Sequence, residues 1–220
     1  MPKNFVSNKD EAQRMFRSDV FERLSHIHYT VPLYIFVPVI LFFLYRAIVV
    51  FSLGPIRVLG FIIVGMGVWT LTEYVLHRFL FHWTPPGTFG ARVHFMFHGV
   101  HHDYPNDSKR LVMVPVVSIP LAALFYFSFY LVFGQRDVAP FFVGFMAGYL
   151  FYDMTHYAVH HANLKSRFWL ELKQHHMLHH FVDAHNGYGV SSKFWDIVFR
   201  TMFARSESRL AGKHSFRRSS

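Results

Sequence analysis

The sequence has no cysteine among its 220 residues. This absence excludes disulfide cross-links and metal sites that depend on thiolate ligands. Charged residues are also scarce, since they make up 16% of the chain, whereas roughly a quarter is usual in soluble domains. Residues 1–19 contain no apolar run, so they do not have the pattern of a cleavable signal peptide.

Hydrophobic residues, in contrast, make up 52% of the chain, and 27 residues are Phe. They gather in long apolar runs, which is typical of a protein that crosses a membrane several times. The net charge of +9 could suggest nucleic-acid binding. However, the positive residues flank the apolar runs and form no separate basic domain. We therefore expect a membrane protein without a nucleic-acid partner.

The apolar runs predict an all-α integral membrane protein with four transmembrane helices and a helical cap. The spans are expected at about 31–53, 58–82, 111–133 and 138–161. Polar residues with scattered apolar positions predict an interfacial segment at 1–30. Residues 31–203 then form the membrane domain, and the Ser- and Arg-rich residues 204–220 form a basic disordered tail.

The distribution of positive charge predicts the orientation of these spans. Four spans put both termini and the middle loop on one side of the membrane. That side carries most of the Lys and Arg residues, while the two opposite loops contain only Arg57 and Arg136. By the positive-inside rule, the shared side and its cap face the cytosol. The host membrane is the endoplasmic reticulum or the bacterial inner membrane, and the sequence leaves both open.

Histidine is the most informative residue type, because most of its 17 copies lie in four clusters. Residues i, i+3 and i+4 of an α-helix lie on one face, so such triplets can converge on a metal centre. The second and fourth spans both end in clusters, which places the candidate centre at the cytosolic boundary. The clusters are His77 with His82; His98, His101 and His102; His156, His160 and His161; and His175, His176, His179 and His180.

The spacing further predicts two metal ions. Adjacent residues of an α-helix differ in direction by about 100°, so His101 and His102 should serve different metals. The same angular argument predicts different metals for His77 and His82. Without His161 and His175, which lie off the cleanest spacing, ten candidate ligands remain. Ten are too many for one ion, and two ions can share them. Glu73 and Asp153 lie close before histidines in apolar helices, and we expect these carboxylates to support the ligands from a second shell.

Several motifs around these histidines resemble those of a known family. The segments HRFLFH at 77–82, HGVHHDYP at 98–105, YDMTHY at 152–157 and HMLHH at 176–180 follow one another in its order. The GYGV segment at 187–190 and FWD at 194–196 extend the match. Together they resemble the fatty acid hydroxylase superfamily, and most closely its fatty acid 2-hydroxylase branch. That branch acts on the acyl chains of sphingolipids or their precursors.

The resemblance implies an O2-dependent lipid hydroxylase with two metal ions, expected to be iron, with zinc able to occupy the site in isolated protein. We expect this protein to lack the fused N-terminal cytochrome b5 domain of longer family members. We therefore expect electrons from a separate cytochrome b5-like or ferredoxin-like protein. The implied ligands are His77, His82, His98, His101, His102, His156, His160, His176, His179 and His180.

Other assignments remain open from the sequence. A sterol or carotenoid hydroxylase or a desaturase would use the same chemistry. A zinc hydrolase would need only about three ligands, and a metal transporter or sensor would tend to bind nearer the midplane. His94, His161, His175 and His185 are more simply explained by packing or substrate contact. Weaker candidates for substrate contact are Tyr104, Asn106, Asp107, Lys109, Tyr157, Asn186 and Tyr188.

Overall fold

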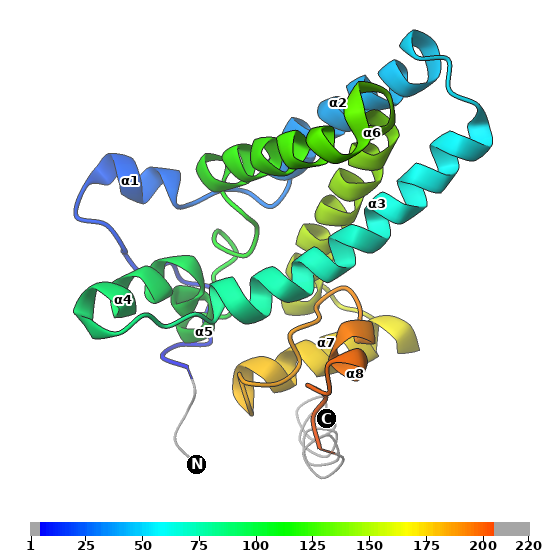
Figure 1. Ribbon diagram of the computed structural model, residues 1–220. Coiled ribbons are helices and arrows are strands. Elements are labelled where there is room, and N and C mark those ends of the chain that lie inside the picture. Colours follow the sequence, from blue (N-terminus) through cyan, green and yellow to red (C-terminus); the bar gives the residue numbers. More distant parts are fainter. Residues whose placement is uncertain (1–4, 205–220) are drawn as a thin grey trace. The chain divides into compact units, whose positions relative to one another are not determined.

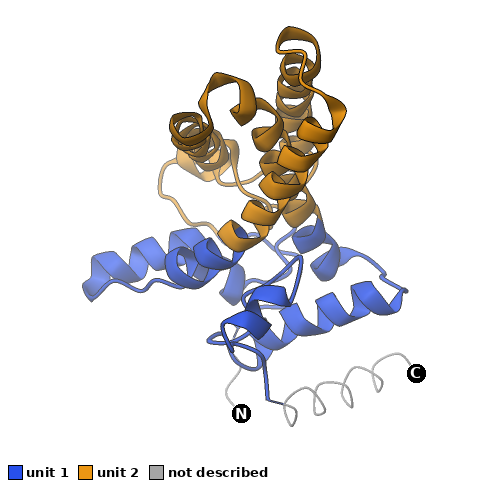
Figure 2. Ribbon diagram, turned by 45° about the vertical axis from the view of Figure 1, so that its right-hand side comes forward, with its two compact units in different colours: residues 1–13, 73–108, 155–220 blue, residues 14–72, 109–154 orange. Residues whose placement is uncertain are grey.

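Helices are the only regular structure in residues 5–204, which this computed structural model describes (Figure 1). The prediction of an all-α protein is confirmed for those residues. The predicted tail, 204–220, lies outside them except for Ala204. Contacts divide the chain into two compact units (Figure 2). Among the described residues, unit 1 comprises 5–13, 73–108 and 155–204, and unit 2 comprises 14–72 and 109–154.

Three helical stretches are long and apolar enough to cross a membrane. The first consists of α2 (Val31–Tyr45) and the π-helix η1 (Arg46–Val50). The second consists of α3 (Pro55–Val75) and the π-helix η2 (Leu76–Phe81), and the third is α6 (Pro115–His161). Many of their large apolar side chains are exposed, as expected where lipid covers the helix.

The long helix α6 consists of two helices that meet at Gly134. Gly134 has φ 69° and ψ 179°, in the positive-φ region that is accessible mainly to glycine. Figure 1 shows the chain changing direction within α6. Aromatic rings from the two halves pack together. The ring centroids of Phe129 and Phe141 are 4.6 Å apart, and those of Phe125 and Phe145 are 5.0 Å apart. The two halves therefore form a helical hairpin in unit 2.

The helix boundaries differ from the predicted spans in two informative places. A span was expected to begin at 111, but the observed helix α6 begins four residues later, at Pro115. Proline suits a first helical position and disfavours helix in the residue before it. The helix α3 begins earlier than the predicted span at 58–82, because Pro55 likewise occupies its first position. Within 84–110 the chain is helical over α4 (Gly87–His94), η3 (Phe95–Gly99) and α5 (Val100–Asp103).

Leucine in place of Gly134 is expected to destabilise the hairpin, because a side chain would be forced into the positive-φ backbone. The free energy of unfolding should fall by about 1–3 kcal/mol. The matched control is Gly60→Leu, in the regular part of α3, where a Cβ atom would meet nothing within 4 Å. Thermal denaturation in detergent should show a lower midpoint for Gly134→Leu than for the control. Equal midpoints would contradict this role for Gly134.

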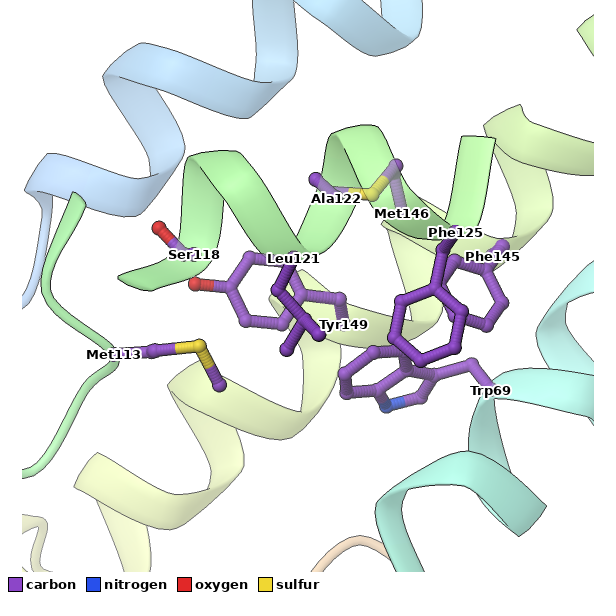
Figure 3. Close-up of a pocket in the computed structure, with 9 residues that line it drawn as sticks. All are labelled: Trp69, Met113, Ser118, Leu121, Ala122, Phe125, Phe145, Met146 and Tyr149. Carbon is purple, nitrogen blue, oxygen red and sulfur yellow. The ribbon is translucent and has the colours of Figure 1, made fainter. Parts of the chain in front are cut away.

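Unit 2 contains a small pocket within its helices (Figure 3). Rings of Trp69, Phe125, Phe145 and Tyr149 surround it, and the Tyr149 hydroxyl points towards Ser118 at one end. Its volume is about 10 Å³, which is no more than one water molecule requires. The pocket is therefore a packing gap, too small for a lipid chain.

Candidate metal centre

The first pair of histidines is presented by a π-helix. His77 belongs to η2, and the His82 backbone N–H donates to the His77 carbonyl at 3.2 Å. This i to i+5 pattern has more residues per turn than an α-helix, so it brings both rings to one side. The sequence prediction that these two histidines serve different metals is therefore wrong for this geometry. Their rings lie together, with centroids 5.1 Å apart.

The other histidines come from three helical segments of unit 1. His98 lies near the end of the π-helix η3, and α5 follows directly and contains His101 and His102. His156 and His160 lie on the last turns of α6. The helix α7 (Arg167–Phe181) supplies the remaining three near its C-terminal end: His176, His179 and His180.

The ten histidines form two groups of five. Within each group, one ring nitrogen of every residue lies within 4.8 Å of the others. Pairs spaced i and i+4 share a group, whereas the adjacent pairs His101–His102 and His179–His180 are divided between groups. The first histidine group contains His77, His82, His98, His102 and His179, and the second contains His101, His156, His160, His176 and His180.

The nitrogen spacing fits a metal ion in each group. The Nε2 atoms of His77 and His98 are 3.0 Å apart, and those of His101 and His156 are 2.9 Å apart. Ligands at right angles to each other, with bonds of about 2.1 Å, place their nitrogens about 3 Å apart. His102 Nε2 is buried without a hydrogen-bond partner among the described residues, which a metal bond would satisfy.

The rings are also in the protonation state that a metal requires. Burial lowers the pKa of His98, His101 and His102 well below the usual value for histidine. It lowers the pKa of His82 to about 3 and that of His179 to about 4. Near pH 7 these imidazoles are therefore neutral, and neutral imidazole is the form that ligates metals.

A loop at residues 186–191 supports the first histidine group. The Nδ1 atom of His77 lies 2.5 Å from the carbonyl oxygen of Tyr188, and Nδ1 of His179 lies 2.7 Å from that of Asn186. The Tyr188 ring also packs on the first group, with its centroid 5.4 Å from that of His82. Backbone carbonyl oxygens, and not the carboxylates expected from the sequence, therefore meet the Nδ1 atoms of His77 and His179.

Two buried carboxylates hold this loop in turn. Glu73 accepts hydrogen bonds from the backbone N–H groups of Val190 and Ser191, at 2.8 and 2.9 Å, and from the Ser191 hydroxyl. Asp196 accepts from the backbone N–H groups of Tyr188 and Gly189, both at 2.9 Å. The hydrogen bonds of Glu73 in the described structure therefore go to the loop and not to a ligand histidine.

Asp196 belongs to a buried network that the sequence analysis did not identify. Its carboxylate also accepts from His175 Nε2 at 2.9 Å and from the Thr201 hydroxyl at 2.7 Å. Burial opposes ionisation of Asp196, but the hydrogen bonds from His175 and Thr201 outweigh it and hold its pKa below the usual value. The FWD segment marked its position, but only tertiary structure shows its partners.

The remaining candidates from the sequence lie in varied surroundings. Asp153 is buried in unit 2, next to the Tyr149 hydroxyl and the Met113 backbone. Asn106 donates to Asn8, and Tyr157 stacks on His161, with ring centroids 4.9 Å apart. Asp107 is buried and Lys109 is exposed, while Tyr104 is half-buried.

Comparisons with known proteins match this arrangement. Residues 62–201 match the family model for fatty acid hydroxylase. The chain is 35% identical over 210 residues to fatty acid 2-hydroxylase of Homo sapiens, covering 86% of this chain and 56% of that protein. It is 35% identical over 193 residues to dihydroceramide fatty acyl 2-hydroxylase of Arabidopsis thaliana, covering 87% of this chain and 81% of that protein.

A solved structure agrees with the same family. It is that of full-length scs7p, in which only the hydroxylase domain is visible. The TM-score is 0.79 at 35% identity, and the match covers 84% of this chain and 70% of that one.

The fold and the histidine groups define a helical protein with apolar helices long enough to cross a membrane and a candidate site for two metal ions. The chain belongs to the fatty acid hydroxylase family. It spans about half the length of the mammalian relatives that it matches.

Proposed function

We propose that this protein hydroxylates the acyl chain of a membrane lipid at C2, with a fatty acid or the N-acyl chain of a sphingolipid as substrate. The observation that carries this proposal is the pair of buried histidine groups in a chain whose relatives include fatty acid and dihydroceramide 2-hydroxylases. The reaction inserts one atom of O2 into a C–H bond and releases the other as water. It consumes two protons and two electrons.

Each of the two histidine groups would hold one metal ion, and iron is the metal we propose. Bound iron would supply the O2 binding and the oxidising power that C–H hydroxylation requires. The chain itself fixes the direction of the ring nitrogens and excludes bulk water by burying them. Because the metal chemistry does not distinguish one C–H bond from another, the protein must hold the acyl chain so that C2 meets the site.

The residues that contact substrate also belong to this proposal. Tyr188 and Asn186 are the best placed of the seven candidates, because their backbone carbonyls meet ligand histidines. A substrate headgroup near this loop would be close to the first histidine group. Weaker support exists for Tyr104, Asn106, Asp107, Lys109 and Tyr157.

We further propose four membrane spans with the histidine groups on the cytosolic side. The positive-inside pattern supports this orientation, and the Gly134 turn within α6 divides that helix into two candidate spans. The host membrane would be the endoplasmic reticulum or the bacterial inner membrane. A separate cytochrome b5-like or ferredoxin-like protein would deliver the electrons.

Lipid mass spectrometry tests the reaction and the site together. Cells that express the protein are expected to accumulate 2-hydroxylated acyl lipid, and cells that express His179→Ala are expected to contain none above background. His28→Ala is the matched control, because His28 is exposed and lies outside both groups, and it should make normal product.

The products also separate the proposed activity from related ones. Absence of 2-hydroxylated lipid, despite folded and iron-loaded protein with an electron donor, would reject the C2 assignment. A new double bond would then indicate a desaturase, and hydroxylated sterol or carotenoid would indicate the corresponding hydroxylase.

A further inference from the structure

The two histidine groups differ in how their outward ring nitrogens are supported. In the first group, the 186–191 loop meets Nδ1 of His77 and His179 with two backbone carbonyl oxygens. In the second group, Nδ1 atoms of His160, His176 and His180 are buried and have no hydrogen-bond partner among residues 5–204. The two candidate metal positions are therefore not equivalent.

The carbonyl contacts fix the tautomer of the rings that they meet. A carbonyl oxygen can only accept a hydrogen bond, so Nδ1 of neutral His77 and His179 must carry the proton. Their Nε2 atoms then keep the lone pair that a metal requires. Those Nε2 atoms face the other members of the first group, 3.0 Å from His98 and His82, respectively. The loop thus prepares these two ligands before a metal arrives.

The loop can do this only if its own backbone is held in place. Asp196 is fully buried, and its two oxygens accept four hydrogen bonds, two of them from the loop. Glu73 is 4% exposed and accepts three, all from Val190 and Ser191. Both ends of the segment 188–191 are therefore fixed by a carboxylate.

We propose that the carboxylate-held 186–191 loop makes the first histidine group the tighter of two unequal metal positions, with Asp196 and Glu73 as positioning residues. This inference rests on the proposed dimetal function. Outer partners of ligating histidines typically change metal affinity by about 10–100-fold. The first group has such partners on two ligands, whereas at least three ligands of the second group lack them in the described structure. Metal should fill the first group before the second.

Two isosteric substitutions distinguish positioning from a general loss of charge. In Asp196→Asn, the amide NH₂ must replace one oxygen. Whichever oxygen it replaces, it faces the backbone N–H of Tyr188 or Gly189, so one of those donors loses its acceptor. In Glu73→Gln, the remaining carbonyl oxygen can accept from Val190 and Ser191, and the NH₂ can donate to the Ser191 hydroxyl. Asp196→Asn should therefore disturb the loop, while Glu73→Gln should preserve it and Glu73→Leu should not.

The experiment measures Zn²⁺ binding to the metal-free, full-length protein in detergent by competition with a chromophoric chelator. Unmodified protein is expected to bind two Zn²⁺ ions in two steps of different affinity. Asp196→Asn and Glu73→Leu should weaken the tighter step by about 10–100-fold and leave the weaker step within about threefold. Glu73→Gln should behave as the unmodified protein. The double variant His156→Ala with His160→Ala should lose the weaker step only.

Equal affinities in the unmodified protein would overturn the inference, and so would an equal effect of Asp196→Asn on both steps. Loss of the tighter step in the His156→Ala, His160→Ala variant would also overturn it, because the second group would then be the tighter one. The two affinities of the unmodified protein, together with the step that is lost in the His156→Ala, His160→Ala variant, test the inference even if a loop variant does not fold. Binding of fewer than two Zn²⁺ ions would instead reject the dimetal function itself, so the two failures are distinguishable.

Discussion

His101→Ala and His102→Ala are expected to remove different metal ions, although the two residues are adjacent. His102 belongs to the first histidine group and His101 to the second. Each variant should therefore retain one metal ion where the unmodified protein holds two. Mutation of an outer partner of a ligating histidine lowers metal affinity or activity by up to about 100-fold. The proposed chemistry requires both ions, so loss of a whole ion should lower activity by at least on the order of 100-fold. Elemental analysis and lipid mass spectrometry measure the two effects.

The adjacent pair His160 and His161 provides the control for this prediction. His160 belongs to the second group, whereas His161 lies outside both and stacks on Tyr157. His161→Ala should keep both metal ions and activity within about threefold of the unmodified protein. If His101→Ala and His102→Ala lost the same ion, with the double variant still retaining one, the division into two groups would be wrong.

Much of the candidate site can be predicted from the sequence, because the spacing of residues along a helix is a local property. It identified the ten histidines that the structure gathers, and the angle between neighbours such as His179 and His180 accounts for their division between groups. The same arithmetic failed for His77 and His82, because it assumes an α-helix. The local change to π-helix at Leu76–Phe81 moves His82 to the same side as His77, and no residue in that segment signals the change.

The supporting structure could not be predicted in the same way, because it depends on contacts between distant segments. The position of Glu73 in an apolar helix indicates a supporting role near the histidines. Its partners, Val190 and Ser191, are nevertheless 117 and 118 residues away in the sequence. Asp196 lies in a short helix, α8 (Phe194–Val198), with no periodic pattern to reveal its burial. Backbone carbonyls, such as that of Tyr188, have no sequence signature at all. Long-range hydrogen bonds of this kind are visible only after folding.

The packing of α3 in unit 2 shows a similar limit and leads to a second large expected effect. Small residues such as the three glycines of α3 can permit close helix packing, but a Cβ atom on Gly60 or Gly67 would meet nothing within 4 Å. Only Gly65 makes the close approach, since its Cβ would lie 2.1 Å from the Phe141 carbonyl oxygen. The partner helix contributes Gly144, whose Cβ would lie 2.0 Å from the Ile62 carbonyl oxygen.

Gly144→Leu is therefore expected to force these two helices apart. A backbone oxygen cannot move aside as a flexible side chain can, so the cost should reach or exceed the roughly 3 kcal/mol upper range of overpacking. For a chain of this size, each kcal/mol lowers the thermal midpoint by about 2–4 °C, so a fall of about 6–12 °C is expected in detergent. Gly67→Leu is the matched control and should change the midpoint by less than about 2 °C, within the range usual for sites without packing constraints.

The contrast between these glycines matters because membrane helices cannot use the hydrophobic effect to associate, since lipid is as apolar as their side chains. Close backbone approach at Gly65 and Gly144 gives the van der Waals contact that replaces it. If Gly144→Leu and Gly67→Leu lowered the midpoint equally, close approach would not be what holds α3 to the second half of α6. Large interlocking side chains, such as the Trp69 and Phe145 rings with centroids 5.1 Å apart, would then carry the association instead.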